Sequence, residues 1–401
     1  SLQEMDQLLR HPVLLNEADA QELSQLTLLN ELQINSFLQY RKLLGKLLHV
    51  YELQAIPGWD ISTIRQLLPY VKIGSATTIA TETGQRFSEG THQLLIRAGQ
   101  TLEKPVEENG YQGSPLQLMF RYTYRFKNNL QYGVVGDKDA GESFFRRKLK
   151  SGFDFYSVHL FARRIGIIQS LALGDFTVNM GQGLIQWQSL AFKKSTAITS
   201  IKRQSAVLRP YHSAGEFNFH RGLGITISKG RIASTVFVSL RRLSSNINLD
   251  TLNADAYVSS VLSGGYHRTN SELEDRQNLN QLALGGNIQY RYKHGQIGLN
   301  TVYYRYGIPV EKRPEPYNLY SWRGRSWQNA SVDYSYTWRN LHFFGEAAAD
   351  KSGHTVLLNG LLMSADPKID LSLLHRKISP RYQSVQGNAF TESTLPGNES
   401  G

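Results

Sequence analysis

The 401-residue sequence contains no cysteine. This absence excludes disulfide bonds, thiolate zinc sites, iron–sulfur clusters and a cysteine nucleophile. The sequence also has no apolar run of about 18 residues, the length that a membrane-spanning helix requires. Charged residues make up only 19% of the chain, below the roughly one quarter that is usual for soluble domains.

Signatures of catalytic, metal and cofactor sites are missing as well. The 11 histidines form no H-x-x-x-H or H-E-x-x-H pair, so no metal site is predicted. Gly181-Gln182-Gly183 fails as a dinucleotide fingerprint because Gln186 stands where the third glycine belongs. The sequence has no P-loop and no G-x-S-x-G elbow. We therefore predict no catalytic residue, no cofactor and no enzymatic activity.

Positive charge and aromatic residues are abundant by comparison. The chain has 44 Lys+Arg against 33 Asp+Glu, a formal net charge of +11, and 11% aromatic residues. Such a charge attracts nucleic acid, anionic lipid headgroups or an anionic solute. Basic pairs such as Lys202-Arg203 and Arg241-Arg242 are equally compatible with ordinary solvated surface. The charge alone does not select a partner.

The first 75 residues carry a helical pattern. Apolar residues recur at spacings of three and four over 23–38 and again over 50–71. Asp60 is a residue type that caps a helix start, and Pro57-Gly58 is typical of a tight turn. The pattern predicts an all-α N-terminal module of two helical hairpins over residues 1–75, followed by a linker over 76–89.

From residue 90 the pattern changes to alternation. The segments 116–126, 281–292 and 330–339 alternate apolar and polar residues, with a phase change near Asn300 that predicts a β-bulge. Very short connections such as Lys229-Gly230 occur beside long ones such as 243–280, which is typical of outer-membrane barrels. We predict a large antiparallel transmembrane β-barrel over 90–401. A soluble antiparallel barrel or sandwich gives the same alternation and remains the alternative.

One long connection carries a local helix signal. Ser271 and Glu274 have the spacing of a capping box, which predicts a short helix within this loop.

Two sets of motifs resemble a known family. The segments 15–23 and 50–71 resemble tandem helix-hairpin-helix motifs of the ComEA type. The segments 173–187 and 265–274 are similar to barrel signatures of helix-hairpin-helix outer-membrane proteins of the Bacteroidota. The signature residues are Gly174, Asp175, Gly181, Gln182, Gly183, Trp187, Arg268 and Glu274.

The resemblance implies a location and an extent. Proteins of this kind carry a signal peptide, lie in the outer membrane of a Gram-negative bacterium and hold the helical module in the periplasm. They also continue beyond the point where this sequence ends. About thirteen strands can be drawn in this chain, so we expect a barrel truncated before closure and incomplete at its C-terminus, because an open edge inside lipid is very costly.

The helical module suggests a nucleic-acid role. Helix-hairpin-helix motifs bind DNA phosphates through glycine-rich turns, but here Asp60 stands where a second glycine belongs and would repel a phosphate. The candidate residues for binding DNA or a partner are Pro57, Gly58, Trp59, Asp60, Arg41, Lys42, Lys46 and Arg65.

Three functional hypotheses follow. The first is an outer-membrane conduit or platform whose periplasmic domain binds or takes up double-stranded DNA. The second is a membrane-anchored component that docks a periplasmic or secretion-system protein and binds no nucleic acid. Outer-membrane lipid is a partner in both. The third is a barrel hydrolase, for which Ser157 beside His159, or hydroxyls near His342 and His375, are the available pairs.

Overall fold

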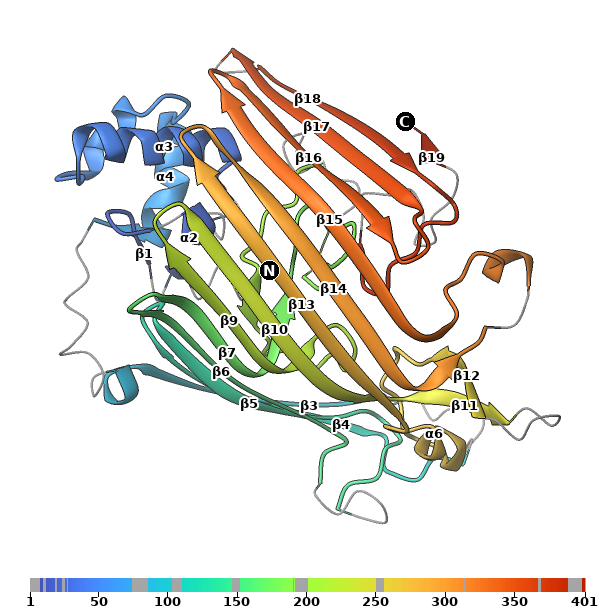
Figure 1. The fold of residues 1–401 in the computed structure, drawn as a ribbon. Helices are drawn as coiled ribbons and strands as arrows, with labels where there is room; N and C mark the ends of the chain where they lie inside the picture. Colours follow the sequence, from blue (N-terminus) through green and yellow to red (C-terminus); the bar gives the residue numbers. More distant parts are fainter. Residues whose placement is uncertain are drawn as a thin grey trace.

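The computed structural model describes residues 8–9, 12–18, 20–23, 26, 28–73, 86–102, 110–145, 152–189, 191, 201–249, 256–312, 315–366, 369–388 and 399–400. Most of the described chain is β-strand (Figure 1). Among the described residues, no helix is both long and apolar enough to cross a bilayer.

The N-terminal region, defined here as residues 8–73, mixes short helices with a small sheet. Its elements are β1 (Val13–Leu14), α2 (Ala20–Leu23), α3 (Glu31–Leu44), the 3-10 helix η1 (Val50–Ala55), α4 (Ile61–Leu67), η2 (Leu68–Tyr70) and β2 (Val71–Lys72). Strands β1 and β2 pair in parallel and join the two ends of the region. Helix α3 begins where Asn30 and Gln33 form a reciprocal capping box and ends at Gly45.

The barrel contains thirteen strands of nine or more residues within the described part of the chain. These strands are β3 (Thr91–Gln100), β4 (Leu116–Phe126), β5 (Leu130–Lys138), β6 (Phe155–Ile165), β7 (Ile168–Val178), β9 (His220–Lys229), β10 (Ile232–Leu243), β13 (Leu279–Tyr292), β14 (Gly295–Val310), β15 (Gly324–Trp338), β16 (Leu341–Asp350), β17 (Thr355–Asp366) and β18 (Ile369–Ile378). Each pairs antiparallel with the next of the series.

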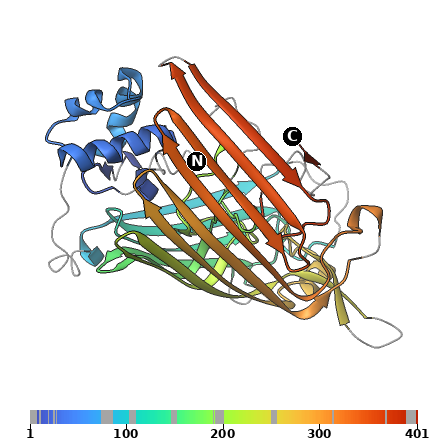
Figure 2. The ribbon, with the colours of Figure 1, turned by 45° about the horizontal axis from the view of Figure 1, so that its top comes forward.

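Shorter elements complete the barrel at its rims. They are β8 (Leu208–Pro210), β11 (Ser245–Leu249), β12 (Ala256–Val261), α6 (Asn270–Glu274), η4 (Pro316–Asn318) and β19 (Glu399–Ser400). The strand order is that of a closed barrel, in which the two-residue β19 stands between β18 and β3. The N-terminal helices lie at one end of the barrel, and α6, β11 and β12 lie at the other (Figures 1 and 2).

The two faces of the wall differ in polarity. In β15, Val332, Tyr334 and Trp338 are exposed on the outer face, whereas Ser331 and Asp333 are buried on the inner face. The alternation predicted for 330–339 is confirmed, as is the one for 281–292, where Ile288 lies outside and Asn287 inside. The barrel therefore presents an apolar outer surface.

One segment of the chain packs inside the barrel, against the inner faces of β7, β10, β13, β14, β16 and β17. We call residues 179–189 and 201–207, which connect β7 to β8, the plug segment. Its apolar side chains pack with wall residues in one buried cluster that includes Met180, Leu184, Phe237, Tyr304 and Phe344. In Figure 1 this green segment runs between the front and back walls of the barrel.

Several sequence expectations are not confirmed. The N-terminal region is not an all-α tandem module, because the β1–β2 pair closes it and part of its predicted helix is the 3-10 turn η1. The expectation of a barrel truncated before closure stays a prediction, because the closed strand order depends on the two-residue β19, which pairs with β18 only at Lys377 and Ile378. The linker predicted over 76–89 lies mostly outside the described residues.

Two local expectations also fail in detail. No bulge occurs at Asn300, since β14 keeps one register with β15 from Gly295 to Arg305 and shifts only beyond Arg305. The short helix of the long loop is confirmed as α6, but its capping box consists of Thr269 and Glu272 and not of Ser271 and Glu274.

Candidate functional site

The first barrel signature turns the chain from the wall into the lumen. Gly174 has a φ of 81°, and a Cβ there would lie 2.2 Å from the carbonyl oxygen of Val158, so only glycine fits between β6 and β7. The buried Asp175 carboxylate accepts hydrogen bonds from Arg221 Nε at 2.6 Å and from Arg221 Nη2 at 2.8 Å. This pair fixes the end of β7 just before the plug segment begins.

The glycine–glutamine–glycine turn anchors the plug segment to the opposite wall. The fully buried Glu346 carboxylate of β16 accepts hydrogen bonds from the backbone N–H of Gln182 at 2.6 Å and of Leu184 at 3.1 Å. Gly181 has a φ of 52°, and a Cβ there would meet the Glu346 carboxyl group at 2.6 Å. A side chain at position 181 would therefore displace the Glu346 carboxyl group from the turn, and the positive φ also favours glycine there.

The end of the signature is fixed by neighbouring segments. The Trp187 backbone N–H donates to the Gln386 carbonyl at 2.8 Å, and the Arg203 guanidinium lies 5.5 Å from the Trp187 ring centroid. The Gly183 carbonyl accepts from Asn388 at 2.9 Å. Gly174, Asp175, Gly181, Gln182, Gly183 and Trp187 thus act together to hold the plug segment.

The second signature lies elsewhere, at the long-loop rim. Arg268 stacks on the Tyr266 ring at 4.3 Å and pairs with Glu272 at 3.1 Å, while Glu274 is exposed at the end of α6. The structure does not bring Arg268 and Glu274 to the plug segment.

The residues predicted to bind DNA or a partner serve partly structural roles. Trp59 is buried and donates through Nε1 to the Gln33 carbonyl, Asp60 caps α4 by accepting from the Thr63 N–H, and Arg41 donates to the Leu15 carbonyl. Pro57, Gly58, Lys42, Lys46 and Arg65 are exposed. The predicted capping role of Asp60 is confirmed, and its hydrogen bonds lower the pKa of its carboxyl group.

The basic pairs also differ from free surface charge. Lys202 is buried and pairs with Glu31 at 3.1 Å, which ties the plug segment to the start of α3. Arg241 is buried and donates to the carbonyl of Phe217 at 2.7 Å. In each of these two basic pairs, at least one residue therefore supports the architecture.

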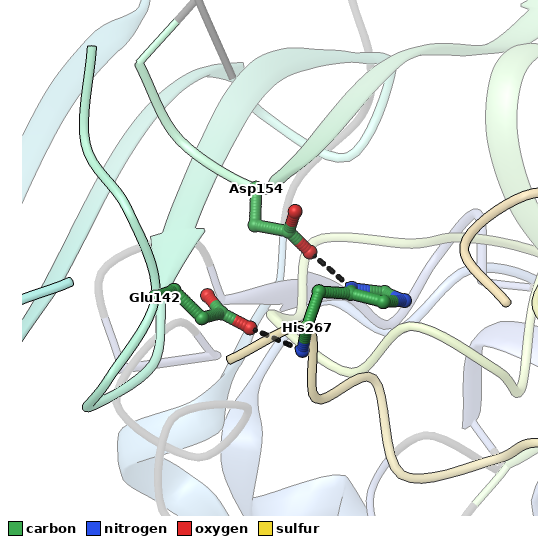
Figure 3. A group of neighbouring side chains, drawn as sticks. All are labelled: Glu142, Asp154 and His267. Carbon is green, nitrogen blue, oxygen red and sulfur yellow. Dashed lines mark hydrogen bonds and ion pairs between the residues drawn. The ribbon is translucent and has the colours of Figure 1, made fainter. Parts of the chain in front are cut away.

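A buried polar cluster lies at the long-loop rim. Asp154 precedes β6, Glu142 lies in the loop after β5, and His267 lies in the loop before α6 (Figure 3). His267 Nδ1 lies 2.5 Å from Asp154 Oδ2, and the His267 backbone N–H donates to Glu142 at 3.0 Å. Burial and the nearby charge of Asp154 raise the pKa of Glu142 to about 7.

The three side chains have the composition of a metal site, but their atoms are already engaged. The Glu142 oxygens accept the N–H groups of His267 and Asp139, and Asp154 Oδ1 lies 2.8 Å from Arg276 Nε. His267 Nε2 lies 3.0 Å from Ser244 Oγ. A divalent cation here would face the Arg276 charge and would have to displace these partners, so the cluster fits a hydrogen-bond network better than a metal.

None of this cluster was predicted as a site. Its members lie far apart in the sequence and in loops without a local motif, and only His267 falls within a recognised signature segment. The hydroxyl–histidine pairs that were considered involve other residues.

Together these features define a closed antiparallel β-barrel with an occupied lumen, an N-terminal region at its short-turn end and a polar cluster at its long-loop end. Among proteins of known family or function, no family model and no curated sequence matches the chain.

Several solved outer-membrane proteins show a distant likeness. A loop-deletion mutant of OmpT of Vibrio cholerae has 10% identity and a TM-score of 0.29, covering 72% of this chain and 93% of its own. The anion-selective porin of Comamonas acidovorans has 11% identity and a TM-score of 0.27, covering 73% and 88%. OmpF of Salmonella typhi in complex with daunomycin has 10% identity and a TM-score of 0.29, covering 77% and 93%. Since these TM-scores are low, the barrel assignment depends on the strand pairing of this chain alone.

Proposed function

We propose that this protein is a membrane-anchored platform of the bacterial outer membrane whose plugged barrel holds the N-terminal region in the periplasm to dock a periplasmic or secretion-system protein. The observation that carries the proposal is the plug segment, because a segment packed against the inner wall narrows the path through the barrel and opposes free passage.

The outer surface supports a membrane location. Large apolar side chains such as Leu240 (67% exposed), Ile288 and Leu299 follow one another on the outer faces of neighbouring strands. An apolar band of this kind is unfavourable in water and favourable against lipid chains. The N-terminal region contacts the short turns, and Asn128 in one of them donates to Glu22 at 2.9 Å. Short turns face the periplasm in outer-membrane barrels.

Two measurements test the platform. Purified protein is reconstituted into vesicles and floated through a density gradient, and its conductance is then recorded in planar bilayers. We expect the protein to float with the vesicles and to show no steady open-pore current. Protein that stays at the bottom of the gradient contradicts the membrane anchor, and a large steady current contradicts the plugged lumen.

An exposed apolar surface favours a protein partner. Leu43, Leu44, Leu48 and Tyr51 lie where α3 ends and η1 begins, and their side chains are 70–87% exposed. A cluster of this kind at one site is typical of protein interfaces. A photocrosslinker at Leu48 should give a discrete adduct in intact cells, and the same group at the exposed Gln54 serves as the control. Equal, diffuse products at both positions would argue against docking here.

DNA binding remains a second candidate because Lys42, Lys46 and Arg65 are exposed on the same region. Against it, Asp60 is charged and Arg41 is occupied with the Leu15 carbonyl. Titration of the full chain in detergent with duplex DNA at several salt concentrations decides the question. A phosphate-contacting protein shows affinity that falls steeply with salt, and no salt-dependent affinity would end the nucleic-acid hypothesis.

A further inference from the structure

At the long-loop rim, Asp154, His267 and Ser244 form a chain of hydrogen-bond contacts that the proposed platform role does not explain. Asp154 Oδ2 lies 2.5 Å from His267 Nδ1, and His267 Nε2 lies 3.0 Å from Ser244 Oγ. Ser244 is half-buried between β10 and β11, whereas His267 and Asp154 are almost completely buried. A carboxylate on Nδ1 and a hydroxyl on Nε2 are the contacts that make a serine hydroxyl nucleophilic.

The surroundings hold each of the three in place. The backbone N–H of Gln277 donates to Ser244 Oγ at 3.2 Å, with Gln277 in a left-handed conformation (φ 50°) that is uncommon for a residue with a side chain. Arg276 pairs with Asp154, and Glu142 accepts the backbone N–H of His267. Because Ser244 Oγ accepts this N–H, its hydroxyl donates to His267 Nε2 in the tautomer that carries the ring proton on Nδ1.

Ser244 opens into a cavity of about 730 Å³. The cavity reaches from inner residues such as Tyr306 to outer-face residues of β10 and β13. Leu240 and Leu282 give its outer side an apolar lining, and Arg242 and Arg305 add positive charge on the same outer face. Burial and the nearby carboxylates of Asp154 and Glu142 raise the pKa of Glu216, which also lines the cavity, to about 9. The cavity is therefore cationic at neutral pH.

We propose that Ser244, His267 and Asp154 form a hydrolytic site for acyl esters of anionic phospholipids. The substrate class rests on the proposed membrane location, because outer-face residues of β10, β13 and β14 form part of the cavity lining. There Arg242 and Arg305 match a headgroup phosphate, and Leu240 and Leu282 match the start of an acyl chain. The hydroxyl–histidine–carboxylate geometry itself does not depend on the membrane.

Ester hydrolysis at this site proceeds by acyl transfer to Ser244 and then to water. Ser244 Oγ attacks the ester carbonyl carbon and its proton passes to His267 Nε2 while Asp154 holds the ring through Nδ1. The bond to the alcohol breaks, and the alcohol leaves with the proton from His267. Water then attacks the acyl-serine, His267 takes its proton, and the carboxylic acid leaves as Ser244 Oγ recovers a proton. The net change is ester plus water to alcohol plus acid.

The test uses the full chain in detergent, so that it does not depend on membrane insertion. A fluorophosphonate probe should label the protein at Ser244, because attack by Oγ forms a P–O bond and releases fluoride. Ser244→Ala should abolish labelling, and Asp154→Asn should slow it by about 1,000-fold or more. Ser263→Ala, an exposed serine of the same cavity, is the matched control and should label like the unaltered protein.

Folding is checked for each variant by heat-modified migration in SDS gels. Folded protein that does not react with the probe, or Ser244→Ala that still reacts, overturns the proposal. Mixed micelles of phosphatidylglycerol or phosphatidylcholine then test the substrate class: faster release of fatty acid from phosphatidylglycerol supports it, and equal rates refute the role of Arg242 and Arg305. Probe labelling combined with failure to float would instead reject the membrane platform and leave the nucleophile in place.

Discussion

The contact between Glu346 and the plug segment leads to a quantitative prediction. Glu346→Ala removes the acceptor for two buried N–H groups, those of Gln182 and Leu184. Each buried N–H left without a partner costs roughly 1–3 kcal/mol. The free energy that keeps the plug segment docked should therefore fall by about 2–6 kcal/mol, with the wall strands left intact.

Because the chain has no cysteine, a single introduced thiol reports on this change without interference. Leu184→Cys places the thiol at a buried position of the plug segment. Its reaction with a water-soluble maleimide measures how often the segment opens. At about 1.4 kcal/mol per tenfold, Glu346→Ala should speed the reaction by roughly 30-fold or more.

Two controls make this result interpretable. Glu346→Gln keeps an acceptor oxygen and should give an intermediate rate, and Glu274→Gln, at the exposed end of α6, should leave the rate unchanged. Equal rates in all four proteins, each migrating as a folded barrel, would refute the anchoring role of Glu346.

Three further changes have distinct expected outcomes. Asp60→Ala removes the cap of α4 and should destabilise the N-terminal region by about 1 kcal/mol, seen as faster amide hydrogen exchange in 61–67. Gly174→Ala should destabilise the barrel by more than about 2 kcal/mol, because the added Cβ would overlap the Val158 carbonyl at a φ that disfavours alanine. A thermal transition equal to that of the unaltered protein would contradict the close contact between Gly174 and Val158. Glu142 binds its proton more tightly when folded, since its pKa is raised to about 7, so it contributes a loss of stability as pH rises from about 4.5 to 7. Glu142→Gln should remove this loss of about 3 kcal/mol. If the thermal transition of the variant changes between pH 5 and pH 8 as much as that of the unaltered protein, the raised pKa of Glu142 is contradicted.

The alternation of apolar and polar residues predicts the inner and outer faces of a strand where the inner residues are polar. It fails to do so where the inner residues are apolar. In β15 the inner residues Ser331 and Asp333 contrast with Val332 and Tyr334, so the sequence pattern reports the faces directly. In β14 the inner face carries Val302 and Tyr304, which pack on the plug segment, and Tyr304 donates to Gln186 at 2.5 Å. The apparent phase change near Asn300 reflects this apolar filling and not a bulge.

Local patterns miss features made by distant segments. Val13–Leu14 and Val71–Lys72 are too short to show a two-residue period, so the β1–β2 pair was not predicted and the region was assigned as all-α. The first signature segment was identified without its role, because Glu346, the residue it binds, lies in another strand. Ser244, His267 and Asp154 come from three separate loops, and only the closed barrel brings them together.

The ion pair between Lys202 and Glu31 has a mechanical consequence. Lys202 Nζ also lies 2.9 Å from His342 Nε2 on the inner wall, and the neighbouring Gln204 donates to the same Glu31 at 2.8 Å. A force applied to α3 would therefore reach both the inner wall and the plug segment through the buried Lys202 ammonium group, alongside direct contacts to the wall such as that of Asn35 with Thr337. Displacement of the N-terminal region and displacement of the plug segment would then be coupled.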